Sequence, residues 1–369
     1  MSTEGSRVFG LDAMRALAIT LVVLVHSDYM LWEHWPGFPW LPFVDGVDLF
    51  FVLSGYLVGG ILFRYATTGA PSPRRLLDFW QRRWLRTLPN YYLFLIINIV
   101  LLSFGLTRGM LNYSALYYFA FLQNLFKPVE TFFWESWSLV IEEWFYLLFP
   151  VLLFGLMRFF DVRARRAFVI TAVLFILGPT IMRFITAPGI DRLFDAEMFI
   201  RKLAIYRLDT IGFGVLAAWV HHVFPALWAR MRWPAFAIGA VGTIAVGQFY
   251  GSAHLWFSMT WFFTLGAISM SLLLPQLSAW KSVPRWGAPV VFMSRISYAL
   301  YLVHMPVRDL YDHLYPDRSL PVAVALFLGY WAIVITIAAV VHRWWETPFM
   351  DLRDRLGARL GVKTVSSSS

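Results

Sequence analysis

The chain has 369 residues and a formal net charge of +9, but only 14% of its residues are charged and its mean hydropathy is +0.62. A water-soluble domain carries about 25% charged residues, so this composition excludes a soluble globular enzyme and indicates a protein that crosses a membrane many times. The sequence contains no cysteine, which excludes disulfides, a thiolate nucleophile and thiolate metal sites.

The first hydrophobic stretch, residues 8–30, is long enough to cross a bilayer but contains Asp12, Arg15 and His26. Charged side chains inside a membrane span are costly and suggest a functional site. Arg15 and His26 are separated by about three helical turns, so we expect them on one face of the helix, about 16 Å apart along its axis. The structural alternative pairs Arg15 with Asp12 and gives His26 an ordinary hydrogen bond.

Ten stretches have the length and hydropathy of membrane spans and predict an all-α integral membrane protein. They are residues 8–30, 48–65, 88–106, 137–159, 167–187, 203–222, 234–250, 256–279, 288–307 and 321–345. A further segment, 113–126, is too short to cross and predicts a re-entrant or interfacial piece. We expect residues 1–350 to form one transmembrane domain, followed by a basic cytoplasmic tail, 351–369, that is disordered at its end.

The distribution of positive charge predicts the orientation of these spans. With ten spans and a cytoplasmic N-terminus, the inner connections hold twenty Lys and Arg residues and the outer connections seven. If 113–126 also crossed, the basic cluster at 163–166 would move outside. The charges therefore favour ten spans with both termini in the cytoplasm.

The connection at 71–88 has the pattern of an amphipathic helix. One face carries Arg75, Arg82 and Arg86, and the opposite face carries Leu77, Trp80, Trp84 and Leu88. We expect this helix to lie in the inner interface, as an anchor to anionic lipid. Alternatively, its arginines and Arg15 bind a phosphorylated ligand that enters from the cytoplasm.

Acidic residues are expected at the depth of His26. Asp48 begins the second span from the outer side, and Glu142 and Glu143 lie a turn or two into the fourth. A carboxylate beside a histidine fixes its tautomer, which suits a general base. The alternative for Asp48 is a helix cap, and adjacent helical residues point about 100° apart, so at most one glutamate is expected to face the His26 site. For His304, in the ninth span, the sequence allows two expectations: a second base at the site, or a residue that makes a structural hydrogen bond.

Six blocks of the sequence, in order, resemble acyltransferase family 3, the membrane acyltransferases related to bacterial sugar and polysaccharide O-acetyltransferases. The blocks are Arg15 with His26, DLFFVLSGYL at 48–57, FWQRRWLRTLP at 79–89, SWSLVIEEWFYLLFP at 136–150, SYALYLVH at 297–304 and WETPF at 345–349. The resemblance implies ten helices in a bacterial inner membrane, an acyl donor that is usually acetyl-CoA, and an acceptor hydroxyl that is often on a glycan at the outer side. Arg15 and His26 would be the Arg/His pair of the family.

We therefore expect a membrane O-acyltransferase in which a hydroxyl attacks the thioester of acyl-CoA, directly or through an acyl-His26 intermediate. The expected catalytic residues are His26, Arg15, Glu142, Glu143 and Asp48, with His26 as general base oriented by Asp48 or Glu142. The expected donor-binding residues are Arg15, Arg82, Arg83, Arg86 and Ser54. Expected partners are acyl-CoA, a carbohydrate or glycolipid acceptor and the lipid bilayer, with no nucleic acid and no metal.

The main alternative is a transporter or flippase for a glycan or a lipid-linked intermediate. Buried Arg, His and Glu residues also suit proton-coupled transport. Transporters of this kind are typically built from internal repeats with a matched pair of broken helices, and neither is evident in the sequence. A purely structural scaffold would leave the intramembrane charges unexplained.

Overall fold

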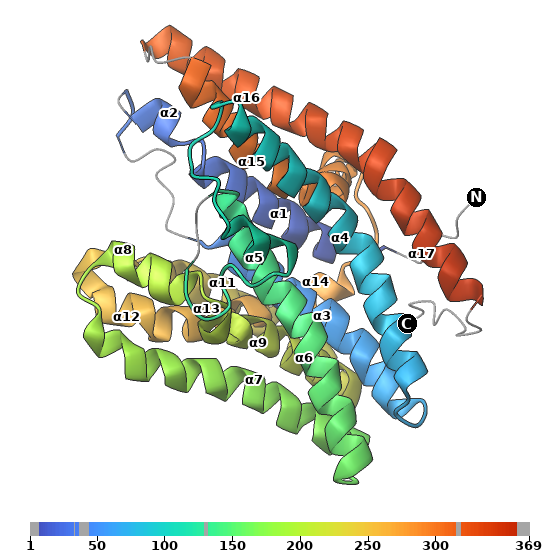
Figure 1. Ribbon diagram of the computed structural model, residues 1–369. Helices are drawn as coiled ribbons and strands as arrows, with labels where there is room; N and C mark the ends of the chain where they lie inside the picture. Colours follow the sequence, from blue (N-terminus) through green and yellow to red (C-terminus); the bar gives the residue numbers. More distant parts are fainter. Residues whose placement is uncertain (1–6, 33, 37–43, 129–131, 315–318, 360–369) are drawn as a thin grey trace.

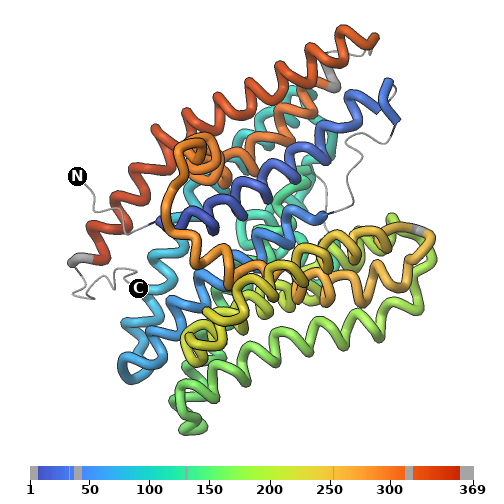
Figure 2. Tube along the Cα trace, turned by 180° about the vertical axis from the view of Figure 1, so that it is seen from behind, coloured from blue at the N-terminus to red at the C-terminus, as the bar shows by residue number. Residues whose placement is uncertain are grey.

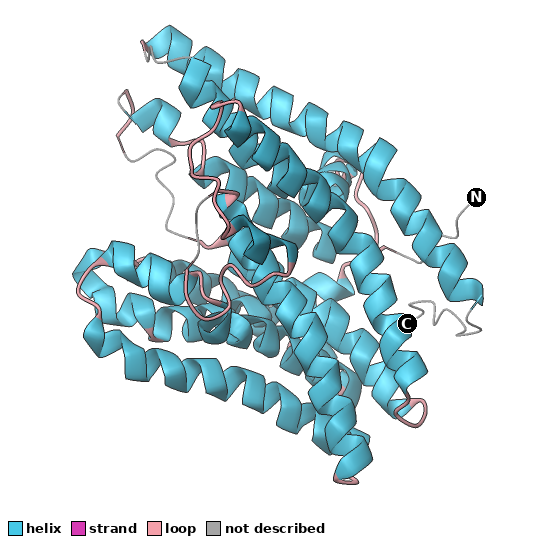
Figure 3. Cartoon of the chain, in the orientation of Figure 1, coloured by secondary structure: helices cyan, strands magenta, loops and turns pink. Residues whose placement is uncertain are grey.

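The computed structural model describes residues 7–32, 34–36, 44–128, 132–314 and 319–359. Within these ranges all regular secondary structure is helical (Figures 1 and 3). The predicted all-α class is therefore confirmed.

The helices follow one another along the chain as short and long segments. They are α1 (Phe9–Val25), α2 (Tyr29–Trp32), α3 (Gly46–Thr67), α4 (Pro73–Ser103), α5 (Ala115–Phe119), η1 (Trp134–Ser136), α6 (Trp137–Phe159), α7 (Ala164–Thr186), η2 (Ala187–Gly189), α8 (Leu193–Ala196), η3 (Glu197–Arg201), α9 (Ala204–Val223), α10 (Pro225–Arg230), α11 (Arg232–Gly247), η4 (Ser252–His254), α12 (Leu255–Met259), α13 (Trp261–Ser271), α14 (Leu274–Ala279), α15 (Ala288–Leu314), α16 (Leu320–Val341), η5 (His342–Glu346) and α17 (Thr347–Arg359).

Seven helical segments of the described chain are long and apolar enough to cross a membrane. An eighth results if the pair Leu193–Arg201 and Ala204–Val223, which is bent by 67°, forms one span. Two of the ten predicted spans are shorter than these, since α1 has 17 residues and α11 has 16. The protein is thus a multi-pass membrane protein, and its described residues hold seven or eight spans by length and hydropathy, where ten were predicted.

Helix α4 joins two segments that were expected to be separate. The amphipathic stretch at 71–88 and the span at 88–106 form one helix of 31 residues, Pro73–Ser103. The Ser72 hydroxyl accepts a hydrogen bond from the Arg75 amide, and Pro73 occupies the first turn, as is typical of a helix N-terminus. Pro89 lies inside the helix and does not end it. The boundary predicted at residue 88 is therefore wrong.

The segment at 113–126 was predicted not to span the membrane, and the structure agrees with this. It contains only the five-residue helix α5. The hydroxyls of Tyr91 and Tyr92 on α4 donate hydrogen bonds to the carbonyls of Tyr118 and Phe119 at distances of 2.7 and 2.9 Å. These bonds fix the segment against α4.

Helices α3 and α9 approach closely at two glycines. A Cβ atom added to Gly55 would collide with the carbonyl oxygen of Ile211, and one added to Gly214 would collide with the carbonyl oxygen of Val52. Small residues allow helix backbones in membranes to touch in this way. This contact fixes the rotation of α3 about its axis, and hence the direction of Ser54, which precedes Gly55 and lines the cavity described below.

Figures 1 and 2 agree on the placement of the chain ends within the described structure. The start of α1 and the end of α17 lie at one end of the helix bundle, and α2 and α8 lie at the other. We call these the α17 end and the α2 end. Along α1, Arg15 therefore lies toward the α17 end and His26 lies at the α2 end.

Candidate functional site

A cavity of about 110 Å³ lies among α1, α3, α4, α6 and α15. Its polar lining consists of Arg15, Ser54, Arg83, Arg86, Thr87, Ser138, Glu142, Tyr146, Ser297, Tyr298 and Tyr301. Three of these side chains are arginines and one is a carboxylate. When ionised, they give the cavity a net positive charge, so it suits an anionic or strongly dipolar ligand.

Arg15 faces this cavity although it also touches Asp12. Its Nη1 lies 3.4 Å from the Asp12 carboxylate and 3.2 Å from the Ser294 hydroxyl of α15. Arg7 binds the same carboxylate at shorter distances, 2.8 and 2.9 Å. Asp12 is therefore paired mainly with Arg7, and the simple Arg15–Asp12 pair does not account for Arg15.

Ser54, Tyr146 and Glu142 form a hydrogen-bonded chain along the wall of the cavity. The Ser54 Oγ and Tyr146 Oη atoms are 2.7 Å apart, and Tyr146 Oη donates to Glu142 Oε2 at 3.3 Å. The neighbouring Glu143 does not line the cavity, because it accepts a 2.6 Å hydrogen bond from the buried Thr87 hydroxyl. Of the two adjacent glutamates, Glu142 is the one that faces the cavity.

The three arginines of α4 that were predicted to bind the donor have different surroundings. Arg83 and Arg86 line the cavity, and the buried Nε of Arg83 has no hydrogen-bond partner in the described chain. Arg82 instead binds Asp78 through 3.1 Å hydrogen bonds and lies beside Gly357 of α17. Arg82, predicted with the donor-binding group, therefore does not line the cavity, because its guanidinium is held by Asp78 one turn earlier on α4.

His26 is outside the cavity and follows the last residue of α1. Its Nδ1 lies 2.8 Å from the Val22 carbonyl oxygen and 3.3 Å from Nε2 of His304 on α15. Tyr301, at the edge of the cavity, lies one turn before His304, and their ring centroids are 5.5 Å apart. The histidine pair therefore lies just beyond the Tyr301 end of the cavity.

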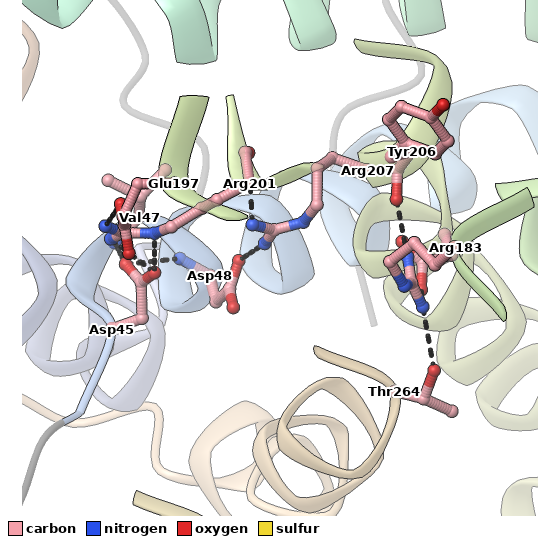
Figure 4. A network of polar contacts seen from close by, with 10 residues as sticks. Asp45, Val47, Asp48, Arg183, Glu197, Arg201, Tyr206, Arg207 and Thr264 are labelled. Carbon is pink, nitrogen blue, oxygen red and sulfur yellow. Dashed lines mark hydrogen bonds and ion pairs between the residues drawn. The ribbon is translucent and has the colours of Figure 1, made fainter. Parts of the chain in front are cut away.

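We expected Asp48 to contact His26, but it does not. It forms an ion pair with Arg207 of α9, and both side chains are buried (Figure 4). Asp45 is the residue that caps α3, by accepting hydrogen bonds from the amides of Val47 and Asp48. Glu142 is bonded to Tyr146 rather than to His26. The expected orientation of His26 by either carboxylate is therefore wrong, and His304 occupies that position.

Figure 4 shows that the Asp48–Arg207 pair lies in a larger network of polar contacts. Arg201 binds Asp45 at 2.7 Å and Glu197 at 2.7 Å, and Arg183 binds Asp209 at 2.6 Å. Arg207 also donates to the Arg201 carbonyl, at the break between η3 and α9. The network therefore stabilises the bend between these two helices.

One polar face of α15 was not recognised from the sequence. Ser294, Ser297, Tyr298 and Tyr301 recur at helical spacing and face α1, α6 or the cavity. The Tyr301 hydroxyl is 2.6 Å from the Ser138 hydroxyl of α6 and donates to the Glu135 carbonyl. The 3–4 residue spacing of these hydroxyls within an apolar span was the signal that could have identified them.

Comparisons with known proteins identify the family. The model of a family described as an acyltransferase domain, acyltransferase family 3, matches residues 8–343. A Staphylococcus aureus strain COL protein, provisionally named as an O-acetyltransferase, is 28% identical over 368 residues, covering 92% of this chain and 57% of the relative. The O-acetyltransferase OatA of S. aureus strain NCTC 8325 is 26% identical over 390 residues, covering 92% of this chain and 56% of OatA.

The chain thus spans a little over half the length of these curated relatives. No solved structure matches it. The family match extends over most of the sequence and includes every helix that lines the cavity. The chain belongs to acyltransferase family 3.

Proposed function

We propose that this protein is a membrane O-acyltransferase. It transfers an acyl group from cytoplasmic acyl-CoA to a hydroxyl of a carbohydrate-containing acceptor, and the proposed acyl group is acetyl. The observation that carries the proposal is the cavity, in which Arg15, Arg83 and Arg86 from two helices meet Glu142 and Ser54. The names of the O-acetyltransferase relatives support the same chemistry.

The donor would reach the cavity from the α17 end. A cavity of about 110 Å³ is small compared with a whole acyl-CoA, so it would hold the acyl end of the donor, and the nucleotide would lie outside it. Arginine binds phosphate bidentately, and the unpartnered Nε of Arg83 provides one buried donor for an anionic ligand. Arg15, Arg83 and Arg86 would therefore hold the phosphate-bearing arm while the acyl group points toward Tyr301.

The acceptor would react at the α2 end. His26 Nε2 takes the proton of the acceptor hydroxyl, whose oxygen forms a bond to the acyl carbon. The carbon–sulfur bond then breaks, and the CoA thiolate leaves and receives a proton. Arg15 and His26 are about 16 Å apart along α1, so donor binding suits Arg15 better than stabilisation of an oxyanion beside His26.

The proposed location is the bacterial inner membrane, with both termini in the cytoplasm. The start of α1 and the end of α17 lie at the same end of the bundle (Figure 1). The basic residues of the chain are concentrated in the connections assigned to that side, in agreement with the positive-inside rule. The donor and acceptor would then approach from opposite sides of the membrane.

A transporter or flippase for a glycan or lipid-linked intermediate is the second candidate. The bend of 67° between Leu193–Arg201 and Ala204–Val223 favours it, because broken helices form substrate sites in transporters. Such folds usually have two broken helices in matching repeats, whereas the described chain has one bent pair. Movement of labelled glycan in proteoliposomes without an acyl donor would support transport over acylation.

The decisive experiment measures acyl-CoA binding and slow hydrolysis by purified protein in nanodiscs. We expect Arg15→Ala to weaken binding and His26→Ala to reduce acyl transfer by about 10²–10⁴-fold. Arg74→Gln, which changes an exposed arginine of α4 outside the cavity, is the matched control. Failure to bind acetyl-, propionyl- or succinyl-CoA, or near-wild-type transfer by His26→Ala, would contradict the proposal.

A further inference from the structure

We infer that His304 is a positioning residue for His26: its neutral imidazole acts together with the Val22 carbonyl to hold the proton on Nδ1 of His26, and it stabilises the protonated form of His26. The inference rests on the proposed function, in which His26 is the general base. It concerns the contact between Nε2 of His304 and Nδ1 of His26, which are 3.3 Å apart.

The backbone determines the tautomer of His304. Its Nδ1 lies 2.6 Å from the carbonyl oxygen of Tyr301. A carbonyl oxygen only accepts, so Nδ1 carries the proton. A neutral imidazole has one N–H, so Nε2 of His304 presents a lone pair toward His26.

The tautomer of His26 follows in the same way. Its Nδ1 lies 2.8 Å from the carbonyl oxygen of Val22, so Nδ1 carries the proton. That proton is shared between the Val22 carbonyl and the lone pair of His304. Nε2 of His26 is then left unprotonated and able to accept a proton, which is the form that a general base requires.

The surroundings keep His304 in place. The side chain is fully buried, and the Tyr330 hydroxyl donates to its backbone carbonyl at 3.1 Å. One turn earlier, the Tyr301 hydroxyl is bonded to Ser138 and to the Glu135 carbonyl. Contacts from α6, η1 and α16 therefore hold this turn of α15, so the Nε2 lone pair has a fixed direction.

A neutral partner is chemically significant because cations act on His26. They include Arg308 of α15, Arg201 of η3 and Lys202 at its end. A proton placed on His26 is repelled by these three cations. The described structure gives neither histidine a hydrogen bond to a carboxylate, so the Nε2 lone pair of His304 is the side-chain acceptor that offsets this repulsion.

In the reaction, the acceptor O–H proton moves to Nε2 of His26 while the oxygen bonds to the acyl carbon. The thioester carbon–sulfur bond breaks, and the CoA thiolate takes the proton from Nε2 of His26. His304 keeps its own proton on Nδ1 throughout and transfers none. It acts only by accepting the Nδ1–H of the transient imidazolium.

Two amide substitutions separate this role from a structural one. His304→Gln can place its carbonyl oxygen near the position of Nε2 and retain an acceptor for His26. His304→Asn can retain a donor to the Tyr301 carbonyl but is too short to reach His26. A hydrogen bond to a charged group contributes about 1.5–3 kcal/mol, so we expect kcat to fall by about 10- to 100-fold in His304→Asn, with an unchanged KM for acyl-CoA and partial recovery in His304→Gln.

The control is His222→Asn, since His222 also bonds a carbonyl of its own helix, that of Ala218, but lies outside the site. If His304→Asn has wild-type kcat, or if His304→Gln is as slow as His304→Asn, the inference is overturned. Near-wild-type transfer by His26→Ala would instead overturn the proposed function. Loss of activity in His304→Asn, with partial recovery in His304→Gln, would support both the inference and the proposed function.

A measurement on the unmodified protein covers the case in which the variants do not fold. Histidine labelled with ¹⁵N gives distinct signals for protonated and unprotonated ring nitrogens, and the His26 signals are assigned by their loss in His26→Ala. We expect Nδ1 of His26 to be protonated and Nε2 to be unprotonated at neutral pH. A His26 protonated on Nε2 alone would overturn the inference.

Discussion

Glu142 and Glu143 are adjacent on α6, but their side chains point in different directions and bind different partners. Glu142 lines the cavity and accepts a hydrogen bond from Tyr146, whereas Glu143 accepts one from Thr87 of α4. One carboxylate is therefore available to a ligand, and the other joins two helices.

This difference predicts different effects for the same substitution. We expect Glu142→Gln to reduce acyl transfer by about 10²-fold or more with little change in stability, because a glutamine in the cavity wall cannot take up or release a proton. Glu143→Gln keeps an oxygen for the Thr87 hydroxyl, so it should retain most activity and lose about 1 kcal/mol of stability. Transfer rates and thermal unfolding of the two purified variants test this, and equal activity in both would contradict it.

Substitutions of the α4 arginines should also have different effects, depending on whether the arginine lines the cavity. Arg83→Gln and Arg86→Gln each remove a cation from the cavity, and we expect each to weaken acyl-CoA binding by about 10- to 100-fold. Arg82→Gln should leave affinity nearly unchanged, because Arg82 is bonded to Asp78 away from the cavity. Titration of acyl-CoA into the three variants in nanodiscs measures the effect, and weakened binding in Arg82→Gln would disprove the division.

Much of the fold and part of the site could be predicted because both follow from local sequence. Apolar length identifies the helices, and charges inside apolar spans are rare enough to be functional candidates. Arg15 and Glu142 were found this way, Arg83 and Arg86 came from the amphipathic pattern at 71–88, and Ser54 lies in a block that resembles the family; the structure gathers all five around one cavity. Their role in donor binding stays a prediction.

The partners could not be predicted because they come from distant helices. His26 and His304 are 278 residues apart, and Asp48 and Arg207 are 159 apart. Depth in the membrane placed Asp48 level with His26, but depth does not define which side of a helix a residue faces. Val47 and Phe51, four residues apart, line the cavity, so the intervening Asp48 points toward α9.

The contact between α3 and α9 should be intolerant of any side chain. Gly55→Ala and Gly214→Ala each place a methyl group against a backbone carbonyl that cannot move aside. We expect each substitution to destabilise the protein by about 1–3 kcal/mol or more, as overpacking does. Gly155→Ala on α6 is the control, since a Cβ there meets no atom within 4 Å. Equal thermal stability of the Gly55→Ala and Gly155→Ala variants in detergent would refute the close approach.

The buried Asp48–Arg207 pair should behave as a unit. Removal of one partner leaves an uncompensated buried charge, so Asp48→Asn and Arg207→Met should each destabilise the protein by about 3–5 kcal/mol. The double variant removes both charges, and methionine can keep contact with the Phe263 ring, over which Arg207 lies at 3.8 Å. We expect the double variant to be clearly more stable than either single variant.

Thermal unfolding of the four proteins in one detergent gives the coupling between the two residues. The control is the corresponding set of single and double variants at the Arg353–Asp354 pair, in which the Asp354 side chain is 57% exposed. This set should show little coupling. If the losses at Asp48 and Arg207 simply add, the ion pair does not hold α3 to α9. Recovery in the double variant would show that Asp48 and Arg207 stabilise the protein as a pair.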